Sequence, residues 1–236
     1  MKPDVIVTWP DNCDYPLWRE FIRENRSRFN KVIIGFMATN QKPSYKKFII
    51  QSMIEDDITF FNAPLPSGDA DWRNLAINKA LQFVTSDWVW FTEQDFEVSP
   101  SFWHDVDLKL KHYDAVGIYQ GNRLHPCCLF VKKEQIDKTK KNFGIVPNVS
   151  DHFSIFASDL SNNDVFVMQI KEGTYYHHNG LSSNFTLLTN CLTPNHQPLV
   201  FAEYMAKSLN ASVPISDKYR EIALRVFPQT MQELNN

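Results

Sequence analysis

Short apolar runs alternate with amphipathic segments through the first half of the chain, and this alternation constrains the fold more than any other feature. Each run is short enough for a buried strand, and the segments between them carry apolar residues at helical spacing. Because parallel strands need crossover connections, this order predicts an α/β fold with a mainly parallel, Rossmann-like sheet flanked by helices. The runs are Val5–Trp9, Lys31–Phe36, Ile58–Phe61 and Trp88–Phe91.

The edge of this sheet where the parallel strands end is the expected ligand site. Ligands of open α/β sheets bind in the crevice beyond the carboxyl ends of the strands. The stretches that follow the four apolar runs are therefore expected to share one crevice. The helix before the last run is expected to begin near Asp71, because apolar residues repeat at helical spacing from Trp72 to Phe83.

The second half of the chain has a less regular pattern. We expect a helix after Ser99 and Pro100, a Lys-rich helix from Glu134 and a helix opened by Ser150 or Asp151. Residues 165–170 and 174–178 are predicted to form a hairpin, and two amphipathic helices are predicted near 198–209 and 216–227. The prediction is one α/β domain over residues 1–182, followed by a helical C-terminal extension over residues 183–236.

Composition excludes several function classes. A formal net charge of −3 gives no general attraction to nucleic acid or to a membrane surface. No apolar stretch approaches the roughly 18 residues of a transmembrane helix, and the N-terminus lacks a signal-peptide pattern. The four cysteines have neither metal-site nor disulfide-framework spacing, so reduced thiols and a cytoplasmic location are expected.

The triplet Glu93-Gln94-Asp95 follows the last apolar run of the first half. Two carboxylates next to a buried strand need compensation, and a divalent cation with oxygen ligands would provide it. A solvated acidic turn explains the same three residues without any ligand. The triplet alone does not decide between these two interpretations.

The segments around the triplet resemble the GT-A glycosyltransferases, in particular the family-2-like branch that uses nucleotide sugars. In that branch an Arg-Asn pair opens the helix before the strand that ends in an acidic metal-binding motif. Three later segments resemble further parts of the family: a strand-to-helix step, a helix start that contains the general base, and a late segment with a metal-binding histidine. The matching residues are Asp71–Leu81 and Thr85–Phe91, followed by Leu129–Ile136, Ser150–Phe153 and His177–Ser182.

The resemblance implies a role for each candidate site residue. A divalent metal, Mn²⁺ or Mg²⁺, would be held by Glu93, Asp95 and His177. Asp151 would be the general base that deprotonates the acceptor hydroxyl, and a single base without a nucleophile implies inversion. The residues expected to contact the donor are Thr8, Trp9, Arg73 and Gln94.

The sequence departs from the family pattern at several positions, and the roles of several residues have alternatives. The triplet is Glu-Gln-Asp rather than Asp-x-Asp, Ser150 replaces the usual Glu, and the second strand lacks the acidic residues that often hold uracil and ribose. Asp151 is either the base or a helix cap, or both. Strand alternation places one of His177 and His178 on the crevice face, and the spacing favours His177. Trp9 is a core residue or stacks on the donor.

The function expected from these observations is transfer of a hexosyl or pentosyl group from a nucleotide sugar, with a UDP-sugar favoured, to an acceptor hydroxyl. The acceptor is expected to be a saccharide or a hydroxymethylated base in phage DNA. The Lys-rich segment 132–141 is compatible with the DNA acceptor. A sugar-nucleotide nucleotidyltransferase would need a Gly-rich loop after the first strand, where this chain has Trp9–Asn12. A non-catalytic sugar- or nucleic-acid-binding protein is the other alternative.

Overall fold

The structure is a computed structural model that describes residues 1–10, 16–37, 46–65, 71–94, 96–120, 123–144 and 153–177. The predicted alternation of strands and helices is confirmed in the first half. The elements follow one another as β1 (Asp4–Pro10), α1 (Pro16–Asn25), β2 (Val32–Met37), α2 (Lys46–Ser52), β3 (Ile58–Asn62), α3 (Trp72–Ala80) and β4 (Trp88–Thr92). The proposed extension over residues 183–236 lies outside the described residues.

The main sheet has seven strands in the order β3-β2-β1-β4-β7-β6-β8. Strands β1, β2, β3 and β4 are parallel to one another, so their carboxyl ends share one edge. Strand β7 (Arg123–Lys132) runs antiparallel to both β4 and β6 (Ala115–Gln120), and β8 (Val167–Gln169) is parallel to β6. The sheet is therefore mixed but mainly parallel, as the sequence predicted.

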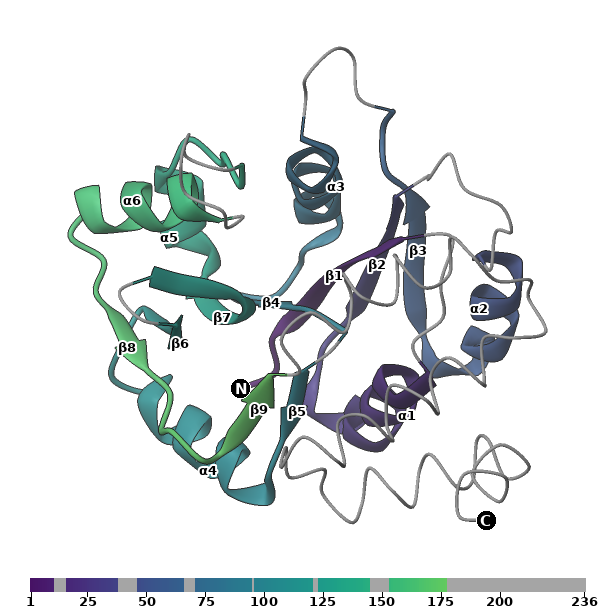
Figure 1. Cartoon of the computed structure of the whole chain (residues 1–236), viewed down its shortest axis with the longest axis horizontal. Helices are drawn as coiled ribbons and strands as arrows, with labels where there is room; N and C mark the ends of the chain where they lie inside the picture. Colours follow the sequence, from purple (N-terminus) through teal and green to yellow (C-terminus); the bar gives the residue numbers. More distant parts are fainter. Residues whose placement is uncertain are drawn as a thin grey trace, which may run out of the picture.

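Helices cover both faces of this sheet (Figure 1). Helices α1 and α4 (Pro100–Lys109) pack on one face, where the core contains Trp9, Trp18, Trp90 and Phe102. Helices α3, α5 (Lys133–Lys138) and α6 (Ser154–Asn162) pack on the other face. Burial of aromatic residues on both faces makes the sheet a rigid support for its edges.

The predicted hairpin over residues 165–170 and 174–178 is wrong. Strand β8 pairs with β6 in the main sheet, whereas β9 (Tyr175–His177) pairs with β5 (Phe96–Val98) in a separate two-stranded sheet. The turn between them, with Gly173 at φ +77°, takes the chain from one sheet to the other. A turn signal in the sequence does not identify the partners of its flanking strands, because both strands find unpaired edges elsewhere.

Candidate active site

The start of helix α3 positions the first site residue at the carboxyl edge of the sheet. The Asp71 carboxylate accepts hydrogen bonds from the backbone N–H groups of Arg73 (2.9 Å) and Asn74 (3.4 Å). This is an N-cap, which satisfies two of the N–H groups that a helix start leaves without partners. The expected helix start near Asp71 is confirmed, and Arg73 lies in the first turn.

Arg73 forms an ion pair with Glu93, the residue that follows β4. Nη1 of Arg73 lies 2.9 Å from Oε1 of Glu93, and the two side chains are 24% and 15% exposed. The backbone N–H of Glu93 donates to the carbonyl of Cys127 on β7, which fixes the turn after β4. A cation in the first turn of a helix opposes the macrodipole. Glu93 supplies a compensating negative charge from within the protein.

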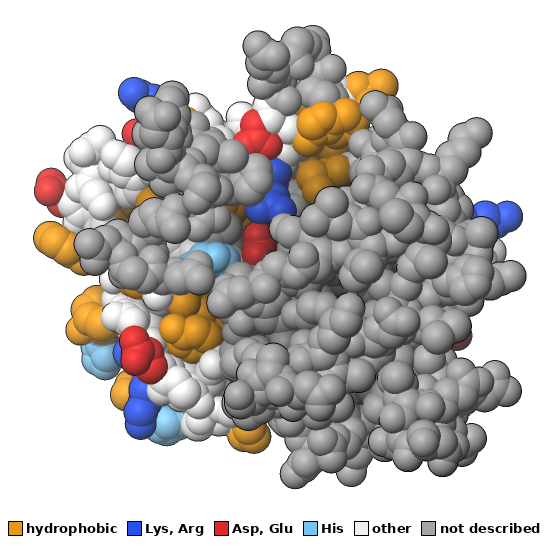
Figure 2. Space-filling view, in the orientation of Figure 1, with side chains coloured by type: hydrophobic (Ala, Val, Ile, Leu, Met, Phe, Trp, Pro, Cys, Tyr) orange, Lys and Arg blue, Asp and Glu red, His pale blue; other side chains and the backbone are white. Residues whose placement is uncertain are grey.

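Arg73 and Glu93 line a small cavity where the ends of β1 and β4 meet α3. Its volume is about 10 Å³, which is the space of roughly one water molecule. Figure 2 shows basic and acidic side chains next to each other near the middle of the face of the molecule that it displays. This cavity therefore brings together β1, α3, the end of β4 and Phe153, which are distant from one another in the chain. The cavity is lined by Ile6, Thr8, Arg73, Ile77, Phe91, Thr92, Glu93 and Phe153.

Gln94 and Trp9, two further residues expected to contact the sugar-nucleotide donor, contact other residues of the protein. The side-chain amide of Gln94, which is buried, donates to the backbone carbonyl of Thr8 and so ties the turn after β4 to β1. Trp9 is fully buried, and its ring packs edge-on against Trp18 at a centroid distance of 5.3 Å. The ring of Trp9 thus has no exposed face for stacking on a nucleobase or sugar.

Phe143 and Phe153 hold together the two ends of the segment that contains Asp151. The N–H of Phe153 donates to the carbonyl of Phe143, and the two rings lie 5.2 Å apart. Both rings also contact Phe91 near the end of β4. Since Phe153 lines the cavity beside Arg73, this aromatic cluster brings both ends of the segment to the candidate site.

Helix α6 begins later than expected. Its first residue is Ser154, and the N-cap residue is Phe153 in the left-handed conformation with φ +67°. The prediction that Ser150 or Asp151 opens the helix is therefore wrong, and Asp151 is not its N-cap residue. An aromatic N-cap has no side-chain acceptor, so the usual cap signal in the sequence is missing. Asp151 itself lies outside the described residues, two positions before Phe153.

The metal-binding residues predicted from the sequence are described in part. Asp95 lies outside the described residues, between Gln94 and Phe96 in the chain. For His177 the backbone is described, and its register partner in the β5–β9 ladder is Phe96. Tyr175 stacks on Phe96 with centroids 5.9 Å apart, which holds β9 against β5. Within the described ranges, no group of three or more His, Cys, Asp or Glu side chains has metal-binding geometry.

Sequence reasoning assigned no role to two asparagines that the structure places beside the site. The Asn74 side-chain oxygen accepts from the N–H of Phe143 (2.9 Å), and the Asn78 amide donates to the carbonyl of Lys141 (2.9 Å). Asn78 also donates to the Asn74 side chain. These contacts tie α3 to the chain that leads toward Asp151. The Arg-Asn pair in the sequence was the signal for this role.

None of the described helices is both long enough and apolar enough to cross a membrane. No protein-family model matches the sequence, and no curated protein sequence matches it. Solved structures, in contrast, do match this chain.

Solved structures that resemble this chain include TarS, a mannosyltransferase and a glucosyl-3-phosphoglycerate synthase. TarS of S. aureus, as its 1–349 fragment, superimposes with a TM-score of 0.55 at 13% identity over 99% of this chain and 82% of the fragment. The mannosyltransferase PcManGT from Pyrobaculum calidifontis, in complex with GDP-Man and Mn²⁺, has a TM-score of 0.54 at 15% identity over 98% and 73% of the two chains. Against the longer TarS structure the chain spans 44% of that protein's length.

The third is the glucosyl-3-phosphoglycerate synthase from Mycobacterium tuberculosis, in complex with Mn²⁺, UDP and phosphoglyceric acid. It has a TM-score of 0.53 at 11% identity over 91% of this chain and 80% of that chain. Identities this low establish the fold and not the activity. The chain has a GT-A-like fold, as the resemblance implied.

Proposed function

We propose that this chain is a metal-dependent glycosyltransferase that moves a sugar from a nucleotide-sugar donor, with a UDP-sugar favoured, to an acceptor hydroxyl. The observation that carries the proposal is the Arg73–Glu93 ion pair at the carboxyl edge of a GT-A-like sheet. The pair would offer a cation to the diphosphate of the donor and a carboxylate to a metal ion. The structural neighbours include a mannosyltransferase and a glucosyl-3-phosphoglycerate synthase, both in complexes that contain Mn²⁺.

The metal would be held by Glu93, Asp95 and His177. Two carboxylates and an imidazole form a donor set that suits Mn²⁺. The fit to this chain is supported by the described backbone, because β9 brings His177 beside Phe96, the residue after Asp95. A bound divalent ion would neutralise the diphosphate charge as a Lewis acid.

Arg73 would stabilise the negative charge that develops on the leaving diphosphate. A guanidinium has five N–H donors, so Arg73 can keep its contact with Glu93 and still donate to phosphate oxygens. The ion pair fixes the orientation of the guanidinium before the donor binds. A hydrogen-bond donor that is already oriented stabilises the developing charge more in a partly buried site than in water.

Asp151 would act as the general base that deprotonates the acceptor hydroxyl. A chain of two residues spans at most about 7 Å, and Phe153, two residues later, lines the cavity with Arg73 and Glu93. The proposal therefore agrees with the described end of this segment. With one base and no protein nucleophile, the reaction would invert the configuration at the anomeric carbon.

The acceptor is proposed to be a saccharide or another small hydroxyl compound, with hydroxymethylated DNA as the alternative. The net charge of −3 favours the small acceptor, because proteins that bind DNA neutralise its phosphates with Lys and Arg.

The test is a panel of nucleotide sugars, incubated with Mn²⁺ or Mg²⁺ and followed by release of the nucleoside diphosphate. We expect metal-dependent release from one UDP-sugar, and mass spectrometry of acceptor mixtures should then show a mass increase of one glycosyl unit. Pyrophosphate release from a nucleoside triphosphate and a sugar 1-phosphate would instead identify a nucleotidyltransferase. Metal-dependent UDP binding without release from any donor would identify a binding protein.

A further inference from the structure

A second cavity lies at the opposite edge of the sheet from Arg73 and Glu93. It is formed by the residues before β1, the 3-10 turn Arg26–Arg28 before β2, and one face of α4. Because the parallel strands begin here and end at the candidate active site, the two sites are at opposite edges of the sheet. The cavity has a volume of about 510 Å³, in the range of sites for small molecules.

The floor of this cavity is rigid and apolar. Phe130 and Val106 are fully buried, and Trp103 is 7% exposed. The Trp103 ring packs edge-on against Trp90 at 5.6 Å, and Trp90 in turn stacks on Phe130 at 5.1 Å. The part of this floor that a ligand can contact is the exposed part of the Trp103 ring, which its aromatic neighbours hold in place.

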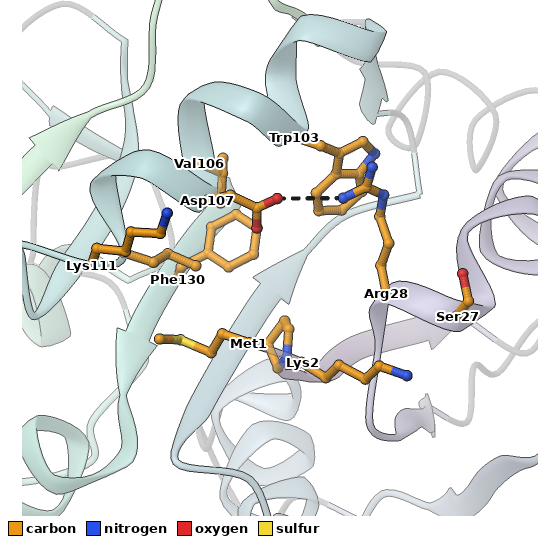
Figure 3. Close-up of a pocket in the computed structure, with 11 residues that line it drawn as sticks. Met1, Lys2, Ser27, Arg28, Trp103, Val106, Asp107, Lys111 and Phe130 are labelled. Atoms are coloured by element: carbon orange, nitrogen blue, oxygen red, sulfur yellow. Dashed lines mark ion pairs between the residues drawn. The ribbon is translucent and has the colours of Figure 1, made fainter.

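The rim of the cavity is positively charged. Among the described residues that line it, Lys2, Arg28 and Lys111 are cationic and Asp107 is the one acid. The side chains of the lining therefore have a formal surplus of two positive charges. Figure 3 shows Arg28 and Lys111 reaching into the cavity from opposite sides, with Asp107 between them.

The Arg28 guanidinium has two neighbours in this cavity, the Trp103 ring and the Asp107 carboxylate. Its carbon lies 4.9 Å from the Trp103 ring centroid, a cation–π contact, and Nη1 is 3.6 Å from the Asp107 carboxylate. Both partners of this ion pair are substantially exposed, 43% for Arg28 and 52% for Asp107. An exposed pair at this separation is weak. A ligand anion with better geometry would replace Asp107.

We propose that this cavity is a second binding site, for a phosphomonoester attached to an apolar or flat body. A phosphomonoester carries close to two negative charges at neutral pH, which matches the surplus on the lining. Arginine is suited to oxyanions because its planar fork donates two parallel hydrogen bonds. The apolar floor would contact the organic part of the ligand. This site is independent of the proposed glycosyl transfer.

The test uses the full chain and three probes, which are phenyl phosphate, inorganic phosphate and phenol. Binding is followed through the indole N–H resonance of Trp103, assigned by comparison with Trp103→Phe. Phenyl phosphate is expected to shift this resonance saturably and to bind at least about threefold more tightly than either fragment, because it uses both the cationic rim and the apolar floor.

Two variants should change the affinity in opposite directions. Arg28→Gln is expected to weaken phenyl phosphate binding about tenfold. Asp107→Asn should strengthen it about threefold, because it removes the anion that competes for Arg28. Lys140→Gln, which removes an exposed charge outside the cavity, should leave the affinity unchanged.

Arg73→Gln separates this site from the proposed donor site and should not alter the Trp103 shift. The proposal would be overturned by an unshifted Trp103 resonance, by equal affinity in Arg28→Gln and the wild type, or by loss of the shift in Arg73→Gln.

Discussion

Nη1 of Arg73 lies 2.9 Å from Oε1 of Glu93, and this ion pair joins the first turn of α3 to the residue that follows β4. The two residues are twenty positions apart in the chain. Their contact explains how a cation is accommodated at a helix N-terminus, where the dipole disfavours it. It also places the group proposed to bind the diphosphate next to a proposed metal ligand.

Arg73→Gln should weaken UDP binding about tenfold, because a charge-assisted contact to the diphosphate is lost. The free energy of unfolding should change by no more than about 1 kcal/mol, since ion pairs with solvent access contribute little. Calorimetric titration with UDP and a thermal melt measure the two effects. Lys79→Gln, at the other end of α3, is the matched control and should bind UDP as the wild type does. Equal affinity in Arg73→Gln and Lys79→Gln would contradict the diphosphate role.

Asn74→Ala should slow sugar transfer about tenfold or more while UDP affinity stays within about twofold. The substitution removes the acceptor for the N–H of Phe143, so the segment that leads to the proposed base loses one of its connections to α3 and keeps the contact from Asn78 to Lys141. A loss of about 1–2 kcal/mol in unfolding free energy should accompany it. Asn162→Ala, an exposed asparagine on α6, is the control for the amide-to-methyl change. Wild-type transfer by Asn74→Ala would show that this connection does not position the base.

Asp151→Asn should keep donor binding and lose transfer by on the order of a hundredfold, because an amide cannot accept the acceptor proton. Initial rates of transfer and UDP affinity are measured side by side. Asp164→Asn removes an exposed carboxylate just after α6 and should transfer normally. If Asp151→Asn transfers sugar at the wild-type rate, another residue is the base.

His177→Ala should weaken Mn²⁺ binding more than Mg²⁺ binding and reduce the difference in activity between the two metals. An imidazole is a better ligand for transition metals than for Mg²⁺. His178→Ala is the matched control and should have little effect, because continued strand alternation would turn it to the other face. An essential His178 with a silent His177 would reverse the assignment, and no effect of either would leave the metal on carboxylates alone.

The first half of the fold could be predicted because its signals are local. Apolar runs, the Asp71 cap and helical spacing up to Phe83 each depend on a few neighbouring residues, and the structure confirms the resulting alternation. The Arg73–Glu93 contact was not predicted as such, because pairing across twenty residues depends on the packed sheet.

The second half could not be predicted as well, because its strand partners are distant in the sequence. Strand β9 pairs with β5, which lies nearly eighty residues earlier, although the turn at Gly173 resembles that of a local hairpin. The start of α6 was missed for a different reason. Phe153 occupies the N-cap in a left-handed conformation that sequence propensity disfavours for an aromatic residue.

The proposed metal site depends most directly on Asp95, and manganese-dependent UDP binding tests it. The titration compares the wild type with Asp95→Asn, with and without Mn²⁺, and circular dichroism confirms that the variant is folded. If Asp95 is a metal ligand, Mn²⁺ strengthens UDP binding in the wild type and Asp95→Asn abolishes this strengthening. Unchanged manganese-dependent UDP affinity in Asp95→Asn would contradict the proposed metal site.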